Sequence, residues 1–245
     1  MRATVYGIPG SHPVRACRLM LDRKGIDYDL VQMPSVVCRP VLRAMGFPGG
    51  TVPAIKLDGR RLQTTLAISR ALDEVKLDPP LFPADPELRE RVEAAESWGD
   101  EVLQPAARRI AYATPIRRKA RADLASFFEG PLLGLSPKLA VAGAAPLLAA
   151  GARVNSASDE RVKADLAALP AQLDHVESLL EAGTIGGEAP NAADFQIATS
   201  VRLLMCFDDL RPMIEARPAG RHAMRITPEF PGRVRAVLPR DWLPG

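Results

Sequence analysis

The sequence predicts a small layered α/β domain followed by an all-α region. Three observations support this expectation. Strand-like and helix-like segments alternate at the start of the chain, prolines cluster after them, and amphipathic helical segments without a convincing strand fill the rest. We expect the α/β domain at residues 1–77, a linker at 78–87 and the helical domain at 88–245.

The first part shows the order βαβ–α–ββα. Strands are expected at residues 3–8, 28–33, 53–57 and 60–64, and helices at 13–24, 36–45 and 64–75. Asp58-Gly59 stands between the last two strands, and an Asp-Gly pair between extended runs is typical of a hairpin. This order fits a mixed sheet with helices packed on it.

The prolines predict the linker, and helical spacing of apolar residues predicts the second part. The linker prolines are Pro79, Pro80, Pro83 and Pro86. Helices are expected at residues 86–104, 118–128, 159–183, 193–205 and 210–216. Asn191 and Asp194 have capping-box spacing, in which each side chain accepts a hydrogen bond from the other residue's backbone. We interpret that pair as part of folding, not of chemistry.

The composition is that of an ordinary globular protein. Of 245 residues, 47% are hydrophobic and 25% charged, and the formal net charge is +3. These values indicate neither general disorder nor a nucleic-acid partner. No secretory signal is visible, and the most apolar run, residues 139–152, is too short to cross a bilayer. We therefore expect a soluble cytoplasmic protein that does not bind membranes.

The cysteines and histidines do not indicate a metal or dithiol centre. The chain has three cysteines, Cys17, Cys38 and Cys206. None belongs to a C-x-x-C pair, which disfavours a zinc ribbon and a dithiol redox site. His175 and His222 have no ligand spacing, so we assign no metal. Cys17 falls on the apolar face of the first helix and is expected in the core.

Ser11 lies where the first strand turns into the first helix, and its hydroxyl has two possible uses. It can cap the helix by accepting a backbone N–H, and Pro13 would suit the first turn. Alternatively, it can donate a hydrogen bond to a thiolate held over the positive end of the helix. His12 is required for neither use and is expected to point to solvent.

Val52-Pro53 directly precedes the third strand. A proline there is placed to be cis, which would leave the backbone of Val52 free to pair with something extended. The alternative is a trans proline that opens an edge strand.

Three motifs in this order resemble the glutathione S-transferase superfamily. "PGSHPVR" (9–15) is similar to the strand-to-helix turn of the serine-type classes, especially delta and theta. "GGTVPAIKLDGRRLQTTLAISRAL" (49–72) is similar to the family's Val-Pro turn, hairpin and third helix. "APNAADFQIATSVRLL" (189–204) is similar to a helix-start motif of its C-terminal domain. The resemblance implies a thioredoxin-like N-terminal domain, an all-α C-terminal domain and a homodimer.

The resemblance also implies roles for five residues. Ser11 would activate the thiol of glutathione, and Val52 and Pro53 would bind its peptide-like part. Thr64 and Thr65 occupy the positions that hold the γ-glutamyl end, where the family usually has Glu-Ser or Gln-Ser. Thr65 keeps a hydroxyl at a helix N-terminus, which suits a carboxylate, but Thr64 cannot pair with an ammonium group.

Two neighbours of these residues bear on the identity of the thiol. Gln63 could compensate for Thr64 only if the turn shifts. Gly49-Gly50 stands where delta-type sequences offer a histidine to the glycyl end. The thiol is therefore expected to be glutathione or another low-molecular-weight thiol.

The leading hypothesis is an enzyme that adds such a thiol to a hydrophobic electrophile, a detoxification chemistry. Trp98 and Tyr112 lie where the family lines its electrophile pocket, although both residues also suit a helical core. The rival hypothesis is a non-catalytic member of the fold that binds ligands or partners, which Thr64 favours. A thiol–disulfide oxidoreductase would need a cysteine where Ser11 stands.

Overall fold

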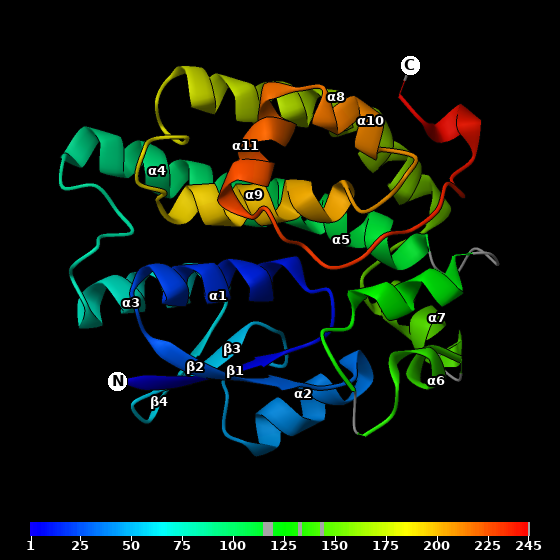
Figure 1. Ribbon diagram of the computed structural model, residues 1–245, viewed down its shortest axis with the longest axis horizontal. Helices are drawn as coiled ribbons and strands as arrows, with labels where there is room; N and C mark the ends of the chain where they lie inside the picture. Colours follow the sequence, from blue (N-terminus) through cyan, green and yellow to red (C-terminus); the bar gives the residue numbers. More distant parts are fainter. Residues whose placement is uncertain (115–119, 132–133, 143–144, 245) are drawn as a thin grey trace.

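A four-stranded mixed sheet forms the N-terminal part of the computed structural model, which describes residues 1–114, 120–131, 134–142 and 145–244 (Figure 1). The strands are β1 (Arg2–Gly7), β2 (Asp27–Gln32), β3 (Ala54–Leu57) and β4 (Arg60–Gln63), in the order β2-β1-β3-β4. β1 is parallel to β2 and antiparallel to β3, and β3 is antiparallel to β4. Alternate residues of β1 are buried, as expected for a strand with one face on the core.

Helices cover both faces of this sheet. α1 (His12–Arg23) and α3 (Thr65–Val75) lie on one face, and α2 (Ser35–Ala44) lies on the other (Figure 1). Cys38 and Leu42 of α2 pack in a small core with Met33, Phe47 and Ala54. The predicted order βαβ–α–ββα and the fold class are confirmed.

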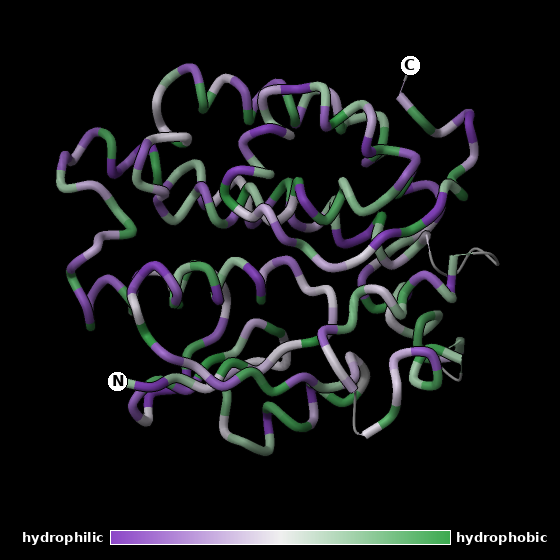
Figure 2. The backbone as a smooth tube through the Cα atoms, in the orientation of Figure 1, coloured by the Kyte–Doolittle hydropathy of each residue, from purple (hydrophilic) through white to green (hydrophobic). Residues whose placement is uncertain are grey.

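The remainder of the described chain is mostly helical. Its helices are α4 (Pro86–Trp98), a π-helical turn (Gly99–Leu103), α5 (Gln104–Ala113), a 3-10 helix (Arg121–Phe127), α6 (Pro137–Ala142), α7 (Ala145–Val154), α8 (Asp159–Glu181), α9 (Ala192–Leu204), α10 (Arg211–Glu215), α11 (Pro218–Ile226) and a last 3-10 turn (Arg240–Trp242). Hydrophilic and hydrophobic residues alternate along the outer helices α4 and α8, as in amphipathic helices (Figure 2).

Three details differ from the sequence-based expectation. The single helix expected over residues 86–104 is interrupted by the π-helical turn. The helix expected at 118–128 is a short 3-10 helix in its described part, and residues 118–119 lie outside the described residues. α6, α7 and α11 were not anticipated. Beyond the linker, strand pairing takes the form of isolated bridge residues, as between Phe207 and Val234.

α9 is the central helix, and its start is fixed by the predicted capping box. Asp194 N donates to Asn191 Oδ1 at 3.1 Å, and Asn191 N donates to Asp194 Oδ2 at 2.8 Å. The Asp194 carboxylate also accepts from Gly186 N at 2.8 Å and lies 3.1 Å from His222 Nε2. All α9 residues are buried, and α9 packs on α1, α4, α5 and α11. The carboxylate therefore ties α9 to α11 and to the preceding loop.

Two ion pairs and a backbone hydrogen bond hold α3 against α1, the linker and α4. The fully buried Lys24 Nζ donates to Asp73 Oδ1 at 2.5 Å and to the Lys76 carbonyl at 2.6 Å. The Asp73 carboxylate also accepts from Leu81 N at 2.8 Å, which holds the linker on α3. Arg70 of α3 pairs with Glu96, a fully buried residue of α4.

Within the described residues, no helix combines the length and the apolar character needed to cross a membrane.

Asp194→Ala should lower the free energy of unfolding by about 2–3 kcal/mol, because it leaves two partly buried backbone donors without an acceptor and removes a cap. Asp85→Ala is the matched control. Asp85 caps α4 through one exposed hydrogen bond to Leu88 N at 2.8 Å, and its loss should cost about 1 kcal/mol. Urea unfolding of both variants measures the difference. Equal losses would contradict a special role for the buried carboxylate.

Glu96 should make stability depend on pH. Burial raises its pKa to about 7 from an ordinary 4.5, against the opposing effects of Ser69 and Arg70. An acid whose pKa is raised on folding binds more protons when folded, so its contribution to the free energy of unfolding falls as pH rises from 4.5 to about 7.

The measurement is the difference between wild type and Glu96→Gln, obtained by urea unfolding between about pH 5 and pH 8. A difference is needed because burial lowers the pKa of His12 to about 3 from 6.5, and this contributes stability that rises with pH over that interval. We expect wild type to lose stability relative to the variant as pH rises. Parallel curves would contradict the raised pKa.

Candidate functional site

One row of paired residues across the sheet determines where the candidate site lies. Tyr6 of β1 pairs with Ala54 of β3, which pairs with Gln63 of β4. β1 and β4 end at or just after this row, and β3 begins at it. The turn that carries Ser11, the Val52-Pro53 bend and Thr64 therefore all leave the same end of the sheet.

Ser11 is the N-cap residue of α1, but its hydroxyl does not cap the helix. Its backbone is extended, with φ −71° and ψ 111°, and the side chain makes no capping hydrogen bond. Its hydroxyl has no partner among the described residues. The capping alternative is therefore wrong, and a half-buried hydroxyl is left free beside the positive end of a twelve-residue helix.

The Val52-Pro53 peptide bond is cis, as predicted. Pro53 is buried, and Val52 is half-buried. The backbone N–H and C=O of Val52 form no hydrogen bond with any described residue. This bend therefore presents one free donor and one free acceptor next to the first residue of β3.

Thr64 and Thr65 begin α3 in very different environments. Thr64 is exposed and has φ +70°, a conformation that is strained for a β-branched residue. Its hydroxyl accepts from Ala67 N at 3.3 Å, which caps α3. Thr65 is buried, and its hydroxyl has no hydrogen-bond partner among the described residues. Backbone strain of this kind costs about 1–3 kcal/mol and tends to occur at functional sites.

Gln63 does not supply the acid or amide group that Thr64 lacks. Its Nε2 donates to the Thr51 carbonyl at 2.7 Å, and its Oε1 accepts from Gly49 N at 2.6 Å. Gln63 thereby holds the loop that leads into the Val52-Pro53 bend. Gly50 in the same loop has no room for a side chain, because a Cβ there would lie 2.3 Å from Arg39 Cγ.

Two residues near Ser11 were placed wrongly or missed by sequence reasoning. His12 was expected to point to solvent, which is wrong: it is 3% exposed and packs toward α5, near the backbone of Gln104. Phe127 covers the turn before Ser11, since a Cβ on Gly10 would lie 2.7 Å from Phe127 Cδ1. No local pattern reveals either contact, because each joins segments about ninety or more residues apart in the chain.

The aromatic candidates for an electrophile pocket take part in helix packing. The Trp98 ring lies against His175 of α8, with centroids 4.3 Å apart. Tyr112 packs on α7, where a Cβ on Gly151 would lie 2.8 Å from Tyr112 Cε1.

All three cysteines are buried free thiols. Burial raises the pKa of Cys17 well above its usual range and that of Cys38 to about 11. These thiols are therefore protonated at neutral pH, and Cys17 lies in the core as predicted.

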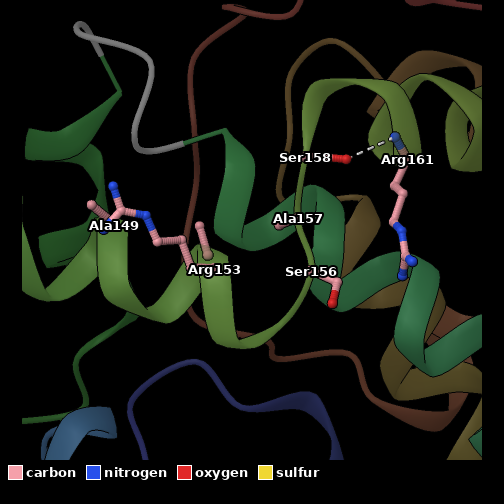
Figure 3. A pocket seen from close by; sticks show the side chains of 7 residues that line it. Ala149, Arg153, Ser156, Ala157, Ser158 and Arg161 are labelled. Carbon is pink, nitrogen blue, oxygen red and sulfur yellow. Dashed lines mark hydrogen bonds between the residues drawn. The ribbon is translucent and has the colours of Figure 1, made fainter.

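A cavity of about 550 Å³ lies elsewhere, where α7 connects to α8 (Figure 3). Arg153 and Arg161 extend away from each other there, and Ser158 caps α8 by accepting from Arg161 N at 3.3 Å (Figure 3). None of the predicted site residues lines this cavity. The described residues include no group of three or more His, Cys, Asp or Glu placed to hold a metal ion.

Comparison with known proteins agrees with the fold. Residues 5–80 match the family model described as glutathione S-transferase, N-terminal domain. The chain has a glutathione S-transferase-like fold. No curated protein sequence is similar enough to count as a relative.

Three solved structures illustrate this likeness. A glutathione S-transferase from Rhodospirillum rubrum F11 is similar at 18% identity and TM-score 0.59, over 98% of this chain and 97% of that one. The beta-etherase LigF from Sphingobium sp. strain SYK-6 is similar at 18% identity and TM-score 0.62, over 92% and 99%. FzlA from C. crescentus is similar at 19% identity and TM-score 0.56, over 92% of both chains. At these identities the likeness defines the fold, and function has to be argued from the site.

Proposed function

We propose that this glutathione S-transferase-like protein is an enzyme that adds a low-molecular-weight thiol to hydrophobic electrophiles. The observation that carries the proposal is the free Ser11 hydroxyl at the N-terminus of α1, at the same end of the sheet as the unpaired backbone of Val52. Ser11 is thereby assigned the role of the serine in the serine-type classes.

Ser11 would act by stabilising the thiolate. A thiol with a pKa near 8.5 is mostly protonated at neutral pH, and each unit of depression is worth about 1.4 kcal/mol. One hydrogen bond to a charged group contributes about 1.5–3 kcal/mol, and the helix dipole adds to it. Together they are sufficient to bring the thiol pKa to neutrality.

The other assigned residues would hold the rest of the thiol ligand. Val52, preceding cis Pro53, would pair with its peptide-like part through the free N–H and C=O. Thr65 and the first turn of α3 would hold a carboxylate, with Thr64 beside it. Because the Gln63 side chain is hydrogen-bonded within the loop, it does not supply the contact to the γ-glutamyl end that Thr64 cannot make. The thiol is glutathione bound weakly, or another small thiol.

A second candidate function is that of a non-catalytic ligand-binding or interaction protein on the same fold. The observation that favours it is the exposed Thr64, whose hydroxyl is used to cap α3 and which brings no charge to the site. The two candidates differ in what happens when Ser11 is changed.

Ser11→Ala should lower kcat/KM for conjugation of a chlorodinitrobenzene with glutathione about ten- to a hundredfold, the loss of one charge-assisted hydrogen bond. Ser158→Ala is the matched control, because it removes the hydroxyl of another N-cap residue far from the site. Wild type without activity, or Ser11→Ala as active as wild type, would favour the non-catalytic candidate.

Thr64→Glu should tighten glutathione binding about tenfold or more, because it supplies the carboxylate that pairs with an ammonium group. Isothermal titration of wild type and variant measures this gain. If glutathione binding appears only in the variant, the natural thiol is a different one.

We also propose a homodimer, as the glutathione S-transferase-like fold commonly forms. Size-exclusion chromatography with light scattering should give twice the mass of one chain. A monomer at micromolar concentration would contradict this.

A further inference from the structure

Arg108 of α5 is a cation near the start of α1 that has no partner in the described part of the chain. It is half-buried, and its guanidinium forms no hydrogen bond or ion pair with any described residue. The neighbouring Arg109 shows the contrast, since its Nε and Nη2 each donate to Asp165 at 2.7 Å. The positions outside the described residues contain no Asp or Glu that could pair with Arg108.

Asp100, an acidic residue whose field acts on Arg108, is hydrogen-bonded to other side chains. Asp100 Oδ1 accepts from Gln104 Nε2 at 2.5 Å and from Gln196 Nε2 at 3.4 Å. Burial lowers the pKa of Arg108, and the fields of Tyr112 and Asp100 oppose that shift. An arginine stays charged in a protein, and no carboxylate of the described residues forms an ion pair with this guanidinium.

His12 connects Arg108 to the start of α1. It is the first residue of α1, it is 3% exposed, and its Nε2 is buried without a partner. Burial and then the field of Arg108 lower the pKa of His12 to about 3, so the ring is neutral at physiological pH. The first turn of α1 thus has a positive helix end and the buried, unpaired Nε2 of His12, and the guanidinium of Arg108 acts on it from α5.

We propose that Arg108 binds an anionic group, a carboxylate or sulfonate, carried by the hydrophobic electrophile. This inference rests on the proposed function and names a substrate class for it. A guanidinium matches such groups with two parallel hydrogen bonds.

Arg108 belongs to α5, in the helical part, whereas Val52, Thr64 and Thr65, assigned to the thiol ligand, leave the end of the sheet. The position of Arg108 therefore suits the second substrate and not the thiol. Arg108 would act as a specificity residue, with no part in thiol activation.

The test compares two electrophiles that differ in charge, 4-chloro-3-nitrobenzoate and 4-chloro-3-nitrobenzamide. In both, the thiolate forms a C–S bond at the ring carbon and chloride leaves. The ratio of kcat/KM for benzoate over benzamide should fall about tenfold or more in Arg108→Gln and partly recover in Arg108→Lys. Arg91→Gln, which removes the same charge from an exposed position of α4, should leave the ratio unchanged. An equal loss for both electrophiles, or no loss, would overturn the inference.

A binding measurement separates this inference from the proposed function. Wild type should bind the unreactive 4-nitrobenzoate about tenfold more tightly than 4-nitrobenzamide in isothermal titration, and this needs neither catalysis nor a folded variant. Suppose that neither chlorinated electrophile is conjugated, but 4-nitrobenzoate binds more tightly than 4-nitrobenzamide and this preference is lost in Arg108→Gln. The proposed reaction then fails, and the assignment of Arg108 to an anionic group stands. Equal affinities in wild type would overturn the anion position whatever the activity.

Discussion

The pairing register of the sheet is the constraint on which the candidate site depends. Tyr6, Ala54 and Gln63 form one row across β1, β3 and β4, so the ends of these strands lie together. Because side chains alternate across a strand, a slip of one residue would turn buried Val5 and Ile55 outward. The burial of these residues therefore fixes the register. The register in turn brings Ser11, Val52 and Thr64 together from segments about forty and ten residues apart in the chain.

The loop around this row is held in place before any ligand binds. Gln63 bridges Gly49 and Thr51 through its side chain, and Thr64 directly after it adopts φ +70°. A strained residue persists only where its surroundings over-determine it, and here the two hydrogen bonds of Gln63 and the cap to Ala67 supply that constraint. The site therefore does not have to meet the ordering cost of this turn when a ligand binds.

The parts of the structure that could be predicted from the sequence are those encoded within a few residues. Asp58-Gly59 predicts the hairpin, the place of Val52-Pro53 directly before β3 favours the cis bend, and Asn191 with Asp194 predicts the cap of α9. The burial of His12 and the cover of Phe127 on Gly10 depend instead on contacts between distant segments. Arg108 was missed for a related reason. The π-helical turn at Gly99–Leu103, where Gly99 lies close to Gln196 of α9, rotates the faces of α5 relative to those of α4. A regular helical periodicity therefore does not predict which arginine of α5 finds a partner.

The neutral state of His12 has a consequence for how the proposed anion position works. A protonated ring would place a second cation beside Arg108 in a buried setting, where like charges repel strongly because little water screens them. Burial removes that charge, so the positive field at the first turn of α1 comes from the helix end and the guanidinium. Neither of these groups loses its charge near neutral pH. The attraction for an anionic electrophile is then nearly independent of pH in that range, and the pH dependence of the proposed reaction reports the ionisation of the thiol.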